Sequence, residues 1–180
     1  MFFFAYNILS IFLLIPVFLF NIYRSIRLGW PLAAAERFGF VSRSRLTKIA
    51  GRPVIWLHAV SVGEAIAARP LLKALRSRYP NHAIVVSNTT ETGKSTAAGF
   101  PEVDLCLYFP FDFLPSVRAL LRSVRPRIII IMETEIWPNF SREAARKSIP
   151  LLLANGRISD RSIKRYLKFS WFFRPPLRCF

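Results

Sequence analysis

Cysteine and histidine are scarce in this chain, with two of each in 180 residues. Cys106 and Cys179 are too few and too far apart in sequence for a disulfide framework or a metal cluster, and they fit a reducing compartment. His58 and His82 alone do not supply the ligands of a metal site. The chain also lacks internal repeats and low-complexity stretches, so the roughly 150 residues after its apolar start are expected to form one domain.

Acidic residues are scarce as well. Ten Asp and Glu stand against 26 Lys and Arg, which gives a formal net charge of +16. The basic residues are spread along the chain after residue 23 instead of forming one block, which argues against a disordered arm that binds nucleic acid. Anionic lipid headgroups or a phosphorylated substrate would each account for the charge.

Charge is missing altogether from residues 2–20, which are apolar and long enough to cross the hydrocarbon core of a bilayer. Basic residues follow this stretch and none precedes it, so the positive-inside rule places the rest of the chain in the cytoplasm. We therefore predict a membrane anchor over 1–23, spanning or deeply monotopic, and a basic amphipathic juxtamembrane segment over 24–50. A cleaved signal peptide is the alternative, but its basic n-region is missing and the apolar run is longer than usual.

Short apolar runs alternate with longer amphipathic ones over residues 51–180. Strands covered on both faces are apolar at consecutive positions, which predicts strands at Pro53–His58, Ala83–Asn88, Asp104–Phe109, Arg127–Met132 and Pro150–Ala154. Helices are predicted at Glu64–Arg78, Thr92–Gly99, Leu114–Val124, Ile136–Lys147 and from Ser159 to near the end. This alternation predicts right-handed βαβ units and an α/β, Rossmann-like doubly wound sheet. Pro70 is expected to break the first of these helices, with the regular part beginning there.

The printed sequence ends on an apolar, basic run, Trp171–Phe180. We expect this run to be an interruption ahead of a further domain. The alternative is a second segment that contacts the membrane.

Ligands of doubly wound folds bind outside the carboxyl ends of the strands, so the loops after the strands are the candidate site. Glu64 follows Gly63 at one strand-to-helix turn, where a glycine lets the backbone approach a ligand. The position of Glu64 fits a helix-start residue favoured by the dipole and, equally, a general base aimed into the crevice. Seven of the ten acidic residues lie in or next to these strands and loops: Glu64, Glu91, Glu102, Asp104, Asp112, Glu133 and Glu135.

Glu133 directly follows the most apolar predicted strand, where the pKa of a carboxyl group is expected to rise unless the group is paired. Glu135 would point to the same side as Glu133 only if the extended backbone continued. Trp137 is interpreted as a core residue, and Pro138 as part of the first turn of the next helix.

Two other features carry little functional weight. Residues 90–96 resemble the end of a phosphate-binding P-loop, but Asn88 stands where the first glycine is required. His58 ends a predicted strand and is interpreted as a buried, hydrogen-bonded histidine.

The loops taken together resemble one family. Their order and spacing are similar to those of 3-deoxy-D-manno-octulosonic acid (Kdo) transferases. The matching segments are 36–39 (ERFG), 55–64 (IWLHAVSVGE), 90–93 (TETG), 110–112 (PFD), 131–139 (IMETEIWPN) and 154–159 (ANGRIS), together with the apolar start. The likeness covers essentially the whole chain. It departs at Asn88 and Gly156, where threonine and alanine are usual.

This resemblance implies that residues 51–180 are the N-terminal, acceptor-binding domain of a two-domain GT-B glycosyltransferase, inverting and without a bound metal or other cofactor. It implies transfer of Kdo from CMP-Kdo to the lipid A precursor (lipid IVA) in lipopolysaccharide biosynthesis. The expected place is the cytoplasmic side of the inner membrane, with anionic lipids as further partners and no nucleic acid. The donor-binding C-terminal domain is expected to be absent, so this chain alone should be inactive.

The resemblance also implies roles for single residues. The glutamate of the SVGE turn is the catalytic base in the family, which is Glu64 here, and the first glutamate of METE supports the transition state, which is Glu133 here. The residues expected to bind the acceptor are Ser61, Gly63, Thr90, Thr92, Gly93, Asn139, Asn155, Arg157 and Ser159.

Two other classes stay open. A non-catalytic basic module that binds membrane surfaces or nucleic acid would not need Glu64. A GT-B transferase for another lipid-linked acceptor would share the fold and differ in its substrate.

Overall fold

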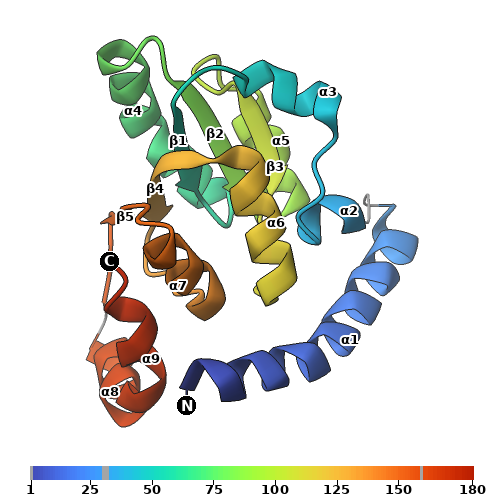
Figure 1. The fold of residues 1–180 in the computed structure, drawn as a ribbon, viewed down its shortest axis with the longest axis vertical. Helices are drawn as coiled ribbons and strands as arrows, with labels where there is room; N and C mark the ends of the chain where they lie inside the picture. The colour runs from blue at the N-terminus through green and yellow to red at the C-terminus, as the bar shows by residue number, and fades with distance from the viewer. Residues whose placement is uncertain (1, 30–32, 159) are drawn as a thin grey trace.

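The computed structural model describes residues 2–29, 33–158 and 160–180. Its centre is a parallel sheet of five strands in the order β3-β2-β1-β4-β5 (Figure 1). The strands are β1 (Val54–His58), β2 (Ala83–Asn88), β3 (Leu105–Tyr108), β4 (Pro126–Met132) and β5 (Leu151–Ala154). Every strand bound lies within one residue of its predicted position, and the predicted α/β, Rossmann-like class is confirmed.

The strand order fixes where a crevice can form. The chain starts at β1, moves outward through β2 to β3, and then returns to place β4 on the other side of β1. The loops after β1 and β4 therefore lead away in opposite directions from neighbouring strands. This switch point lies at the carboxyl ends of the strands, which is where open α/β sheets bind their ligands.

Helices cover both faces of the sheet, because successive strand side chains point to opposite faces. On one face, α6 (Leu114–Val124) and α7 (Pro138–Arg146) share a core cluster with Trp56, whose ring lies 5.2 Å from that of Phe140. On the other face, α4 (Val62–Arg78) and α5 (Glu91–Ala98) share a second cluster with Leu57. The start of α7 at Pro138 confirms that this proline lies in the first helical turn.

The predicted break at Pro70 is wrong, because α4 is continuous through it. A proline removes the hydrogen bond to the carbonyl four residues earlier, which belongs to Ile66. Both residues are exposed, so water can take the place of the missing donor.

The single helix predicted from Ser159 onward is two helices, α8 (Asp160–Lys168) and α9 (Ser170–Leu177). They are separated by Phe169, whose backbone (φ −108°, ψ 34°) is not helical. α9 packs against α7 and reaches the start of the N-terminal helix, where the Trp171 and Phe172 rings lie 6.5 and 5.5 Å from Phe2.

The N-terminal helix α1 (Phe2–Leu28) runs five residues beyond the predicted anchor and lies alongside the domain (Figure 1). Phe18 packs on Phe38 at 5.8 Å, and the Tyr6 hydroxyl donates to Asp112 at 2.7 Å. Length and composition alone qualify α1 to cross a membrane, a test that a signal sequence at the N-terminus also meets. The choice between anchor and signal peptide stays a prediction.

The segment predicted to be juxtamembrane covers the β3 edge of the sheet. The Glu36 carboxylate accepts the Tyr108 N–H at 2.9 Å and pairs with Arg45, whose guanidinium donates to the Cys106 carbonyl. Backbone groups of the edge strand thus find partners within the chain, which blocks pairing with another strand. The described elements of this segment are α2 (Ala34–Arg37), α3 (Arg43–Leu46) and the 3-10 helix η1 (Thr47–Ile49).

Candidate active site

Glu64 lies in the first turn of α4, directly after β1. Ser61 is the N-cap of α4, and its hydroxyl accepts the Glu64 N–H at 3.4 Å. The Glu64 carboxylate in turn accepts the Ser61 hydroxyl at 3.1 Å and the Val60 N–H at 2.8 Å. This reciprocal arrangement is a variant of the capping box, in which the carboxylate accepts the N–H of the residue before the N-cap instead of the N-cap N–H. It establishes the helix-start role and also holds the carboxylate in one place at the switch point.

Glu133 begins the loop after β4 and turns the chain sharply. Its φ of +57° is in the left-handed region, which is strained for a residue other than glycine. Its N–H donates to the Ala154 carbonyl at 2.8 Å, which extends the pairing of β4 with β5 by one bond. The extended backbone therefore stops at Glu133, and the alternation that would have placed Glu135 on the same side ends with it.

Glu135 is an acidic residue whose pKa is affected by the charge of Glu64. Burial raises the pKa of the half-buried Glu135 carboxyl, and the negative charge of Glu64 raises it further. The Trp137 indole opposes the rise, and Glu133 adds a smaller contribution in the same direction as Glu64. Glu135 was not among the site residues predicted from the sequence, although its position two residues after Glu133 was a signal for it.

The loops after β1 and β2 pack closely together. The Thr90 hydroxyl caps α5 by accepting the Gly93 N–H at 3.1 Å, and it donates to the Val60 carbonyl at 3.3 Å. A Cβ atom on Gly93 would lie 2.8 Å from the Thr90 hydroxyl and 3.1 Å from the Ser61 carbonyl carbon. Gly93 is buried, so its small size serves this packing.

Gly63 and Thr92 are exposed beside this packed region. The nearest atom to a Cβ on Gly63 would be the Ser61 hydroxyl oxygen, at 3.9 Å. The described part of the chain therefore does not require a glycine there, and the backbone is open to a ligand.

The loops after β4 and β5 are also joined. The Thr134 hydroxyl donates to the Arg157 carbonyl at 2.7 Å and accepts the Arg157 N–H at 3.2 Å. Asn155 has a left-handed backbone (φ +55°), and both Asn155 and Arg157 are exposed. Ser159, the last predicted acceptor residue, lies outside the described residues.

Asn139 is completely buried, unlike most of the other predicted acceptor residues. Its side-chain amide donates to the Asp112 carbonyl at 2.8 Å, and its N–H donates to the Asp112 carboxylate at 3.0 Å. The same carboxylate accepts the Phe140 N–H at 2.8 Å and the Tyr6 hydroxyl at 2.7 Å. Burial raises the pKa of Asp112, and these donors oppose the rise. Asn139 thus joins the β3 loop to the start of α7.

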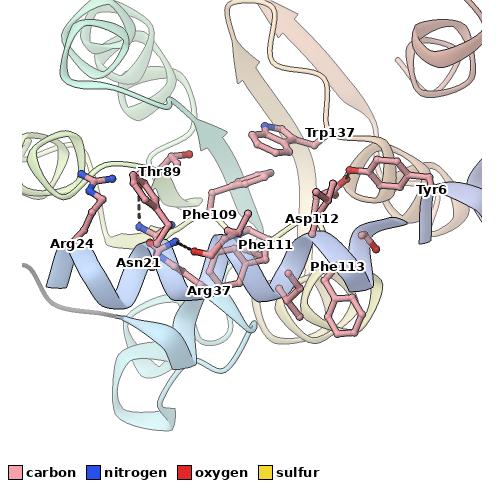
Figure 2. A pocket seen from close by; sticks show the side chains of 16 residues that line it. Tyr6, Asn21, Arg24, Arg37, Thr89, Phe109, Phe111, Asp112, Phe113 and Trp137 are labelled. Atoms are coloured by element: carbon pink, nitrogen blue, oxygen red, sulfur yellow. Dashed lines mark hydrogen bonds between the residues drawn. The ribbon is translucent and has the colours of Figure 1, made fainter. Parts of the chain in front are cut away.

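A cavity of about 350 Å³ lies between α1 and the loop after β3 (Figure 2). Arg24 and Arg37 lie at one end and Tyr6 at the other, with Phe109 and Trp137 between them. This cavity was not expected from the sequence, because the apolar N-terminal stretch was predicted to lie in the bilayer without a partner in the domain. Trp137 packs partly against the core, as interpreted, and also lines this cavity.

His58 is buried and neutral, which confirms its interpretation. Its Nδ1 atom lies 3.0 Å from both the hydroxyl and the carbonyl oxygen of Ser87, and its ring stacks on Phe109 at 3.8 Å. Burial lowers the pKa of His58 to about 3. Within residues 2–29, 33–158 and 160–180, no three His, Cys, Asp or Glu side chains group as metal ligands.

Comparison with known proteins gives a consistent result. The sequence model of a family described as 3-deoxy-D-manno-octulosonic-acid transferase (kdotransferase) matches residues 33–180. The chain belongs to this family. A 3-deoxy-D-manno-octulosonic acid transferase of Haemophilus influenzae is 38% identical over 135 residues, which are 74% of this chain and 31% of that protein.

Two further relatives carry the same name. The Rickettsia felis protein is 37% identical over 79% of this chain and 31% of its own length, and the Rickettsia bellii protein is 31% identical over 91% and 38%. The chain therefore spans about a third of the length of these relatives. The family resemblance expected from the loops is confirmed. The positions of the site residues in this Kdo transferase family member are those described above.

Proposed function

We propose that this chain supplies the acceptor half of a glycosyltransferase that moves Kdo from CMP-Kdo to the lipid A precursor. The observation that carries the proposal is the Glu64 carboxylate, held by Val60 and Ser61 at the switch point of the sheet, in a chain of the Kdo transferase family. The other predicted acceptor residues support it, because most of them lie on the loops at the same edge of the sheet.

In the proposed mechanism Glu64 is the base. A sugar hydroxyl is a poor nucleophile, and a carboxylate within hydrogen-bond reach removes its proton as the new bond forms. The acceptor oxygen bonds to the anomeric carbon of Kdo, the bond from that carbon to the CMP phosphate breaks, and CMP leaves from the opposite face. The capping bonds from Val60 and Ser61 keep the carboxylate oriented, and they must lengthen or be shared when the hydroxyl arrives.

Glu133 and Glu135 have different proposed parts. We assign Glu133 to support of the transition state, as the family resemblance implies. Its strained backbone is consistent with a position held for function. Glu135 lies two residues further along the same loop, where burial and the negative charge of Glu64 raise its pKa, and we assign it to the electrostatic surroundings of the base.

We further propose that the donor is bound by sequence beyond the matched third of the relatives. The chain by itself is then expected to bind acceptor and membrane with negligible transfer. Incubation of the purified chain with CMP-Kdo and lipid IVA tests this, and rapid formation of Kdo-bearing lipid would contradict it.

The catalytic assignment is tested in a chimera that joins this chain to the remaining two thirds of the Haemophilus influenzae relative. Glu64→Gln is expected to lower the transfer rate by about 10²- to 10⁴-fold, the usual contribution of a general base. Binding of lipid IVA should persist, because the amide can keep the Ser61 and Val60 contacts.

Glu102→Gln is the control, since Glu102 lies before β3, at the opposite edge of the sheet from the site. It should transfer at the parent rate. A Glu64→Gln chimera as fast as this control would remove Glu64 from the mechanism and would favour the non-catalytic membrane module.

A further inference from the structure

The cavity beside α1 has an apolar part and a polar end. Leu13, Leu14 and Val17 of α1 face the aromatic residues of the β3 loop across the apolar part. At the polar end, Arg24 and Arg37 line both this cavity and a small adjoining hollow. A ligand that fills both regions must itself have an apolar chain and an anionic group.

Arg37 is held firmly at this polar end. It donates to the Thr89 carbonyl at 2.8 Å, and its guanidinium centre lies 4.5 Å from the Tyr108 ring centroid. Burial lowers the pKa of Arg37, and the nearby positive charge of Arg24 lowers it further, while Glu91 opposes both. Two guanidinium groups that repel each other would both gain from an anion placed between them.

The cavity is also placed to receive a lipid. The face of α1 turned away from the domain carries large exposed apolar side chains, including Ile11, Phe12 and Ile15. If that face contacts the bilayer, the cavity lies directly behind the helix, within reach of a lipid that leaves the membrane along α1.

We propose that this cavity binds a phosphorylated lipid, with one acyl chain against Leu13, Leu14 and Phe109 and the phosphate between Arg24 and Arg37. The identification of this lipid with the glycosyl acceptor rests on the proposed function, whereas the binding site itself does not. Arg37 at the polar end donates to the carbonyl of Thr89, the neighbour of Thr90, so a lipid bound here would present its headgroup side to the loop after β2, which belongs to the candidate active site.

The test measures binding of tritiated dodecyl phosphate to the whole chain in phosphatidylcholine nanodiscs, with the signal of empty nanodiscs subtracted. Arg24→Gln is expected to weaken binding by about tenfold, the value of one charge-assisted hydrogen bond. Arg27→Gln is the matched control: it removes the same charge from the same helix, but Arg27 does not line the cavity. Its binding should stay within about twofold of the parent chain.

A second pair of variants tests the apolar part. Leu14→Trp fills the cavity and should abolish saturable binding, whereas Leu19→Trp, at an exposed position of α1 outside the cavity, should not. Amide hydrogen exchange of the sheet should be the same in all four variants, so that misfolding is recognised separately.

Several outcomes would overturn the site. Equal losses in Arg24→Gln and Arg27→Gln would mean attraction to the surface charge only. Displacement by inorganic phosphate at the concentration of the probe would mean a phosphate site without a lipid component, and equal binding of dodecanol would remove the role of the arginines. If dodecyl phosphate binds as expected but lipid IVA does not compete, the lipid site stands, its identification with the acceptor site fails, and the proposed function is left to the transfer assay of the chimera.

Discussion

The carboxylate of Glu64 has two uses at once. Its bonds to Ser61 and to the Val60 N–H stabilise the start of α4, and the same bonds fix its direction at the switch point. A base that is positioned by its own helix loses little freedom when the substrate arrives. The helix-start interpretation of Glu64 is confirmed by these bonds, and the proposed role as a base is compatible with them.

Glu135 provides a direct test of the electrostatic link across the crevice. Because burial and the Glu64 charge both raise the pKa of Glu135, Glu64→Gln removes one of the two causes and should lower that pKa. NMR titration of the Glu135 carboxyl carbon in the parent chain and in the variant measures the shift. Glu91→Gln serves as the comparison, since Glu91 does not contribute to the Glu135 shift. An unchanged Glu135 titration in Glu64→Gln would mean that the two carboxylates do not face each other.

Two of the predicted acceptor residues have structural contacts within the chain, while their role in acceptor binding stays a prediction. Gly93 is needed where two helix starts approach each other, and Asn139 lies in the interior bonded to Asp112. A family motif marks residues that matter, but it does not separate ligand contact from packing. That distinction depends on long-range neighbours such as Asp112, 27 residues away from Asn139, which local sequence does not specify.

At the scale of elements, the strands were the most predictable part. β1, β2 and β3 are buried along their whole length, and burial on both faces leaves little choice of position. The connections were less predictable. Whether Pro70 breaks α4 depends on whether water can reach the freed carbonyl, and the packing of α1 along the domain depends on contacts with residues more than 100 positions away.

Asp112 connects α1 to α7. One carboxylate accepts hydrogen bonds from Tyr6 of α1 and from the first N–H groups of α7, and a negative group at a helix start is also favoured by the helix dipole. The candidate active-site loop, which ends in Trp137, leads directly into this helix start. Loss of the Asp112 charge should therefore loosen both α1 and the loop.

Asp112→Asn is expected to lower the free energy of unfolding by about 1–3 kcal/mol, because an amide cannot accept from all three donors. Hydrogen exchange at the Asn139 and Phe140 amides should become faster, and Tyr6→Phe should produce a smaller increase at the same amides because it removes only one donor. Exchange in α5 serves as the internal control and should not change. Unchanged exchange at both amides in Asp112→Asn would show that the carboxylate does not hold the helix start.

At the scale of the whole molecule, the residues that the structure describes compensate the large positive charge at few sites. Asp104 pairs with Arg52 at 2.7 Å and with Arg76 at 2.5 Å, and it accepts the Ile84 N–H at 2.7 Å. Burial raises the pKa of Asp104, but these bonds outweigh burial and hold the pKa below its ordinary value. In acid the molecule loses such compensation and gains further positive charge, so its stability should depend strongly on pH.

His58 should dominate this dependence above the range in which carboxylates titrate. Its pKa falls from 6.5 to about 3 because burial disfavours the charged ring. Below pH 6.5 the unfolded chain therefore binds a proton that the folded chain does not. The free energy of unfolding thus has its full value above pH 6.5, as far as His58 is concerned, and decreases as the pH falls toward 3. The free energy of unfolding should decrease by up to about 1.4 kcal/mol per pH unit over this window from this residue alone.

Urea unfolding of the detergent-solubilised chain at a series of pH values measures this slope. His58→Asn can keep a hydrogen bond to Ser87 and carries no titrating group, so its slope between pH 6.5 and 4 should flatten whatever its absolute stability. His82→Asn removes the other histidine and should keep the slope. Asp104→Asn should also keep the slope between pH 6.5 and 4. Because the pKa of Asp104 lies below its ordinary value of 3.8, this variant should differ from the parent chain only in more acidic solution, where it lacks the part of the stability loss that comes from protonation of Asp104. An equal slope in His58→Asn and the parent chain would mean that His58 takes up its proton in the folded state, and that its burial does not exclude the charged ring.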